Sequence, residues 1–193
     1  MNPAICITKA IVFFVLIFGA IGIASADDNN LFSTAEAMDF MSGAYTGGAS
    51  VLTRSRDGIK MTFDATGLEP GAVYTAWWAI FNRPDQCSGG MCGPEDMSMN
   101  AEATQASLLW ASGTIVGQDG VGKFEASLGR EESTGEVISG PGLLSPRQAE
   151  AHIVLRTHGV PIPGMVHEQI STLQGGCNIN TCRNEQAAMH VVH

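Results

Sequence analysis

Alternating apolar and polar positions along the chain predict a series of short strands. The clearest alternation covers residues 59–66, where every second side chain is apolar. A period of two places these apolar side chains on one face of a strand. The Asp-Gly pair at the end of 55–58 tolerates the positive φ of a two-residue hairpin turn, and residues 47–54 read as the partner strand. We therefore predict a β-hairpin over residues 47–66.

Residues 72–82 differ from this pattern because both of their alternating faces are apolar. The segment contains Trp77 and Trp78, carries no charge and lies between two proline-containing turns. Its aromatic content and flanking turns favour a strand over a buried helix, and two apolar faces are expected where a strand is covered on both sides. We interpret the two tryptophans as core side chains. The alternative is a platform for a ligand.

The rest of the chain reads as more short strands with little helix. The strands are expected at 105–116, 121–128, 136–139, 149–158 and 186–192. Residues 27–46 read as a lead-in that is loose or briefly helical, residues 93–104 as a polar loop, and residues 165–173 as about two helical turns. Seven or eight strands with Gly/Pro turns predict an all-β fold, a single antiparallel β-sandwich of Greek-key type over residues 47–193. A small closed barrel is the alternative.

The first 26 residues have the three-part layout of a secretory signal. Lys9 precedes an apolar run over residues 10–23, and Ala24-Ser-Ala26 supplies small residues before two aspartates. An uncleaved anchor is the alternative, but the run is short for a bilayer span of roughly 20 residues. We expect cleavage after Ala26, a secreted or periplasmic location, and no transmembrane segment in the mature chain.

Four cysteines remain in the 167 residues after this signal, in two C-x4-C pairs. An even count in an exported chain predicts disulfides. Three connectivities are open, of which Cys87–Cys92 with Cys177–Cys182 is the simplest. Each short loop would gain only about 2 kcal/mol of chain entropy. The alternative is a four-thiolate zinc site, for which C-x2-C spacing is more usual.

Charge narrows the range of partners. The mature chain has nine basic and 19 acidic side chains, a formal charge of −10, and no basic cluster. Nucleic acid and anionic lipid surfaces are therefore poor partners. No G-x-S-x-G, H-E-x-x-H or Gly-rich phosphate loop is visible, so the sequence favours a role without catalysis.

The histidines are the main candidates for chemistry. His152 and His158 share one face of the strand 149–158 but lie roughly 20 Å apart along it. One of them, together with a histidine from a neighbouring segment, would suit copper or zinc, and thioethers would favour reduced copper. The candidate ligands are His152, His158, His167 and His190, with Met97, Met99, Met165 or Met189 as soft ligands. The structural alternative is that these histidines bond carboxylates and hold loops. We expect Arg156 to pair with Glu150 or Glu168.

Several segments together resemble a family of secreted bacterial proteins of unknown function. They include Tyr74-Thr-Ala-Trp-Trp-Ala-Ile-Phe-Asn82, Gly140-Pro-Gly-Leu-Leu-Ser-Pro-Arg147, and Gly175-Gly-Cys177 with Cys182 and His190. The resemblance covers most of residues 47–192 and implies an exported single domain, with no activity or ligand attached. The stretch from Thr66 to Gly71 is more loosely similar to Greek-key sandwiches of the chordin and copper/zinc superoxide dismutase types. The close H-x-H ligand spacing of the dismutases is missing.

These observations favour a non-catalytic binding or surface-associated module with no assigned cofactor or partner. The alternative is an exported protein that binds copper or zinc through some of the four histidines.

Overall fold

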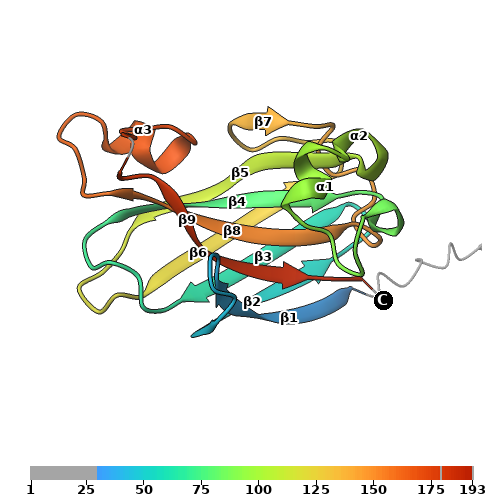
Figure 1. Cartoon of the computed structure of the whole chain (residues 1–193), viewed down its shortest axis with the longest axis horizontal. Coiled ribbons are helices and arrows are strands. Elements are labelled where there is room, and N and C mark those ends of the chain that lie inside the picture. The colour runs from blue at the N-terminus through green and yellow to red at the C-terminus, as the bar shows by residue number, and fades with distance from the viewer. Residues whose placement is uncertain (1–29, 179, 193) are drawn as a thin grey trace, which may run out of the picture.

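The computed structural model describes residues 30–178 and 180–192, so the expected signal peptide at residues 1–26 lies outside the described residues (Figure 1). Nine strands of the described chain form one antiparallel sheet, in the order β6-β3-β2-β1-β9-β8-β4-β5-β7. The strands are β1 (Leu31–Asp39), β2 (Tyr45–Arg54), β3 (Gly58–Ala65), β4 (Val73–Phe81), β5 (Ala106–Ile115), β6 (Gly122–Gly129), β7 (Val137–Ser139), β8 (Glu150–Gly159) and β9 (Arg183–His190).

Helical structure is confined to short segments at the margins of the sheet. These are a 3₁₀ turn (Pro84–Gln86), α1 (Pro94–Ser98), α2 (Ala101–Thr104) and α3 (Val166–Ser171). The two turns expected near residue 165 are confirmed as α3, whereas the polar loop expected at 93–104 contains α1 and α2. No helix in the described chain is long and apolar enough to cross a membrane.

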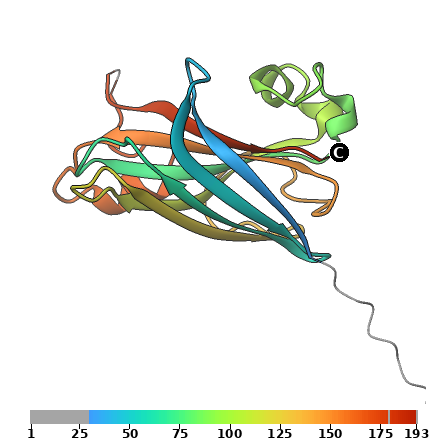
Figure 2. The same ribbon diagram turned by 90° about the horizontal axis from the view of Figure 1, so that it is seen from below.

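The sheet curls into a half-barrel (Figures 1 and 2). The main core joins side chains from both halves of the curled sheet. Phe63 and Phe124 from one half of the sheet belong to the same buried cluster as Trp78 and Ile153 from the other half. Register shifts interrupt the β1–β2, β4–β5, β4–β8 and β8–β9 pairings. Such irregularities bend strands and increase twist, which helps the sheet to close on its own apolar face.

The all-β antiparallel fold with little helix is confirmed. The strand count is nine in the described chain, above the expected seven or eight, and hydrogen bonds run through one continuous sheet. The curl brings the first strands opposite the later ones around one core. The described strands form a single curled sheet, so the two-sheet Greek-key sandwich stays a prediction. The predicted hairpin is present as β2 and β3, joined at Ser55 and Gly58.

Strand β4 lies near the centre of one half of the sheet and is buried along its whole length. Tyr74, Ala76, Trp78 and Ile80 belong to the main core. The opposite face carries Ala79 and Phe81, which form a second apolar cluster with Cys92 and Ala106. The two-sided apolar pattern is explained by these two clusters.

The lead-in interpretation of residues 27–46 is wrong for residues 31–39, which form β1 between β2 and β9. The burial of β1 alternates weakly, and Ala37 is its only fully buried side chain. Pairing with two neighbouring strands, rather than an apolar face of its own, holds this strand in place. A pattern-based reading misses such a strand because the stabilising contacts are backbone hydrogen bonds.

Candidate functional site

A groove of about 560 Å³ lies on the outer face of β4, β8 and β9, away from the main core. Its floor is formed by side chains from all three strands, among them Trp77, Phe81, His152, Val154 and Met189. The end of β1 and the following turn contribute Met38 and Phe40 to one wall. Figure 2 shows this turn and the α1–α2 segment rising on the same side of the sheet.

Strand register explains why these residues share the floor. Ala79 on β4 lies opposite His152 on β8, and His152 lies opposite Met189 on β9. Trp77, two positions before Ala79, lies opposite Val154. Directly opposed residues of antiparallel strands project to the same face, with Cβ atoms about 5 Å apart. Trp77 is therefore a groove residue that is only 1% exposed, while Trp78 belongs to the core.

The segment between β4 and β5 forms a second wall of the groove. It contains the disulfide Cys87–Cys92, which confirms the first predicted pair. Met91, Cys92 and Met97 line the groove from this segment. The Asp96 carboxylate accepts hydrogen bonds from the backbone N–H groups of Ser88 and Gly93, at 2.8 and 2.9 Å. Burial raises the pKa of Asp96, but these hydrogen bonds outweigh it and lower the pKa below its ordinary value. The carboxylate thereby fixes the loop closed by Cys87–Cys92 to the start of α1.

The opposite wall is formed by Leu173 and Gln174, between α3 and the second disulfide. The predicted pair Cys177–Cys182 is also confirmed. The Leu173 backbone is bound on both sides, since its N–H donates to Glu136 at 2.6 Å and its carbonyl oxygen accepts from Arg156 at 3.0 Å. Both disulfide-containing loops therefore contribute residues to the walls of the same groove.

At one end of the groove, Glu150 and His152 form a buried pair. The Nε2 of His152 lies 2.7 Å from Glu150 Oε1, which also accepts the backbone N–H of Cys92 at 2.9 Å. The Phe81 ring meets the imidazole edge to face, with 5.3 Å between the ring centroids. In the neutral form of the imidazole, the carboxylate accepts the Nε2 proton and the other ring nitrogen, Nδ1, carries the lone pair. It makes no hydrogen bond within the described residues.

At the other end of the groove lies Arg156, four residues further along β8. Its Nε donates to the Leu173 carbonyl oxygen, and its Nη1 lies 3.4 Å from Asn184 Oδ1. The salt bridge expected with Glu150 or Glu168 is not formed, and among the described residues no carboxylate pairs with Arg156. Partial burial lowers the pKa of Arg156 from its ordinary value. The groove lining thus includes a half-buried cation that has no carboxylate partner in the described part of the chain.

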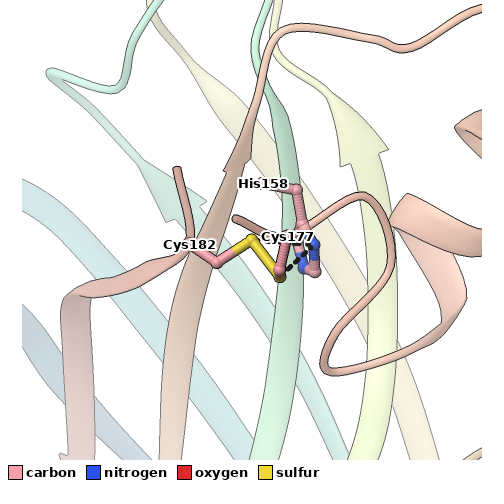
Figure 3. Close-up of side chains that lie close together, drawn as sticks. All are labelled: His158, Cys177 and Cys182. Atoms are coloured by element: carbon pink, nitrogen blue, oxygen red, sulfur yellow. Dashed lines mark hydrogen bonds between the residues drawn. A yellow bond between two sulfur atoms is a disulfide. The ribbon is translucent and has the colours of Figure 1, made fainter. Parts of the chain in front are cut away.

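His158 lies beyond this end, beside the second disulfide. Figure 3 shows its ring against the two sulfur atoms, each 3.7 Å from Nδ1. The ligating atoms of His158, Cys177 and Cys182 lie within 4.8 Å of one another, the one such group of three found in the described chain. Both sulfurs are bonded to each other, so neither is a thiolate. In this state the group is a disulfide packed on an imidazole.

Hydrogen bonds fix the tautomer of His158. The Gly175 carbonyl oxygen, 2.8 Å from Nδ1, can only accept, so Nδ1 carries the proton. The Thr75 hydroxyl then donates to Nε2 at 2.9 Å and accepts the Trp77 indole N–H at 2.8 Å. Burial lowers the pKa of His158, the Gly175 carbonyl opposes this shift, and the nearby Arg156 charge adds to it. His158 is a neutral residue that ties the loop to β4.

The four candidate histidines have separate surroundings. His190 faces the main core between Ser33 and Ser50, opposite Ala151 in the register, so it points away from His152. His167 lies exposed on α3. No three of the four histidines bring their nitrogens together in the part of the chain described. Of the candidate methionines, Met97 and Met189 line the groove, whereas Met99 is 83% exposed.

Sequence reasoning missed Arg156 and Trp77 as groove residues. The alternation of residues 72–82 placed Trp77 and Phe81 on one face, but it carried no sign that this face opens onto a groove. Comparisons with protein-family models, curated proteins and solved structures found no match to this chain.

Proposed function

We propose that this protein is an exported, non-catalytic binding protein that holds a small amphipathic anion in the groove. The observation that carries the proposal is the combination of a mainly apolar lining with Arg156, a half-buried cation that has no carboxylate partner in the described chain. Small-molecule sites have volumes of roughly 300–1,000 Å³ and few polar groups that fix the ligand's orientation. The groove, at about 560 Å³, falls within this range.

The chemistry of the lining favours an apolar body with one anionic group. Phe40 and Met91, which are 37% and 44% exposed, offer apolar surface over the buried rings of Trp77 and Phe81. Arg156 offers N–H donors in a planar fork that suits carboxylate or sulfonate. The net negative charge of the chain opposes anions only at long range, because physiological salt screens charges beyond about 8 Å. Direct contact with Arg156 therefore decides the preference for an anion.

Export accompanies this proposal. Cleavage after Ala26 would deliver the chain to an oxidising compartment, where the two disulfides are retained. The acidic surface argues against nucleic acid as the partner. Two stapled loops then keep the groove walls apart without a ligand, which reduces the entropy lost when a ligand binds.

A fluorescent probe with the required chemistry tests the proposal. 1-Anilinonaphthalene-8-sulfonate joins an aromatic body to a sulfonate, and we expect saturable binding to the oxidised mature protein. Arg156→Gln should weaken binding by about tenfold, the factor that 1.4 kcal/mol of lost binding energy produces. The matched control is Arg183→Gln, because Arg183 is exposed and pairs with Glu185 outside the groove lining.

A competition series identifies the anionic group. Decanoate should displace the probe more effectively than decanol, since both have the same chain but only one has a carboxylate. Equal displacement by the two, or equal effects of the Arg156 and Arg183 substitutions, would contradict the proposal.

A further inference from the structure

The Glu150 end of the groove combines the features of a site for a soft monovalent metal ion. His152 and Met189 are directly opposed on β8 and β9, so their side chains leave the same face of the sheet side by side. Both line the groove, as does Met97 from α1. Strand register places His152 beside Met189. Met97 reaches the same end of the groove by packing on the cluster that contains Phe81, whose ring contacts His152.

The imidazole is oriented as a metal ligand would be. Glu150 accepts from Nε2 of His152 and is itself fixed by the Cys92 N–H, while Phe81 restricts rotation of the ring. The Nδ1 atom makes no hydrogen bond within residues 30–178 and 180–192. It is also not one of the fully buried side-chain atoms that lack a partner there, so it keeps some solvent exposure. Metal-bound histidines typically donate their second ring N–H to a carboxylate in this way.

The donor set selects the ion. Thioether sulfur is a soft, neutral donor that favours Cu(I), whereas zinc prefers thiolate, imidazole and carboxylate ligands. A neutral imidazole and a thioether each bind a cation through a lone pair, so neither ligand has to lose a proton. The Glu150 carboxylate, only 3% exposed, would balance a single positive charge from the far side of the ring.

We propose that His152, Met189 and Met97 form a Cu(I) site at this end of the groove, with Glu150 as the positioning residue. The site differs from the alternative drawn from the sequence, in which several of the four candidate histidines share a copper or zinc ion, because it uses only His152 from that set. It is also independent of the anion proposal, since Arg156 lies four residues along β8 at the other end.

The disulfide-linked group at His158 is a weaker candidate. Its Nδ1 proton is donated to the Gly175 carbonyl, and its sulfurs would need two electrons and two protons from a dithiol reductant before either could bind a metal.

Competition for Cu(I) against bicinchoninate, under ascorbate and with disulfides intact, tests the site. The wild-type mature protein should withdraw one equivalent of Cu(I) from the chromophoric complex. Met189→Leu and His152→Gln should each weaken Cu(I) binding by about tenfold or more, and Glu150→Gln by roughly 10–100-fold, as for other carboxylates behind metal-bound histidines. Met99→Leu is the matched control, because Met99 is exposed outside the groove.

A second measurement separates ligation from folding. Ag(I), which binds like Cu(I) but is redox-inert here, should shift the methyl NMR signals of Met97 and Met189 in methyl-labelled protein and leave Met99 unchanged. Leu for Met conserves volume, so the variants should keep the wild-type circular dichroism. Failure to withdraw Cu(I), or equal effects of Met189→Leu and Met99→Leu, would overturn the proposal. Arg156→Gln should leave Cu(I) affinity unchanged, so this site and the anion proposal can fail separately.

Discussion

The imidazole of His190 lies inside the curled sheet in a polar network. Its two nitrogens lie 2.9 and 3.0 Å from the hydroxyl oxygens of Ser33 and Ser50. The guanidinium of Arg54 donates to Ser33 and to the carbonyl oxygen of His190 itself. Burial, then the charges of Arg54 and His152, lower the pKa of His190 to about 4. His190 is therefore neutral at physiological pH, and its role is to hydrogen-bond Ser33 and Ser50 inside the sheet.

This shift predicts a loss of stability in mild acid. An unfolded histidine has a pKa of about 6.5, so below that pH the unfolded chain binds a proton that folded His190 does not bind until about pH 4. Stability contributed by neutral His190 is present above pH 6.5 and is lost as the pH falls toward 4. The expected loss is about 2 kcal/mol at pH 5.

Urea unfolding between pH 7.5 and 4.5 measures this loss. His190→Asn lowers stability at all pH values but should flatten the dependence between pH 6.5 and 4.5 relative to wild type. His167→Asn is the control, because His167 is exposed and its variant should keep the wild-type slope. Parallel curves for wild type and His190→Asn would show that another group causes the acid sensitivity.

At the scale of elements, α3 is fixed to the sheet by a close backbone approach. The Trp110 indole N–H donates to the Ile170 carbonyl oxygen at 2.9 Å. A Cβ at position 113 on β5 would clash with that same carbonyl group. Gly113 therefore permits the contact that places Leu173 and Gln174 at the groove.

Gly113→Ala should displace α3 and destabilise the protein by about 1–3 kcal/mol, the usual cost of overpacking. Gly90→Ala is the matched control, since a Cβ there has nothing within 4 Å and the change is expected to be neutral. Thermal unfolding of the two variants measures the difference. If both melt with wild type, the approach of α3 to β5 is adjustable and Gly113 has no packing role.

Most strands could be predicted from the sequence because each carries its own pattern. The alternation of 59–66 and the two-sided apolar run at 72–82 correspond to β3 and β4. β1 lacks such a signal, since all but one of its side chains are exposed or only partly buried. Its partners on one side, in β9, are also more than 100 residues away in the sequence. The short α1 and α2 helices were not predicted for a related reason. Hydrogen bonds to Asp96 and the neighbouring disulfide, rather than helix propensity, define that segment.

At the scale of the molecule, the groove could not be predicted because it depends on three segments that meet only in space. The sequence identified His152, Met97 and Met189 as chemically relevant residues, but register and curl decide which of them share a face. His158 and His190 were equally plausible by residue type. Their nitrogens are used by Thr75 and Gly175 in one case and by two serines in the other.

The described chain consists of a sheet with a continuous apolar core and of disulfide-containing loops that form the groove walls. The main core joins β2, β3 and β6 to β4 and β8, and contains no disulfide. Both disulfides lie in the loops that carry the groove walls. Because regions with few buried apolar contacts open at lower free energy than the core, the walls should depend on the disulfides far more than the sheet does.

Reduction of both disulfides should therefore open the groove before it unfolds the sheet. Each short crosslink contributes about 2 kcal/mol, which is small for a whole domain but large for the local opening of a single loop. Hydrogen exchange followed by mass spectrometry should show faster exchange at residues 87–104 and 173–182 after reduction, with the amides of β3, β4 and β6 still protected. A Cys177→Ser/Cys182→Ser variant should reproduce only the second of these changes, which also assigns each wall to its own disulfide. Loss of protection across all strands at once would instead show that the disulfides hold the fold itself together.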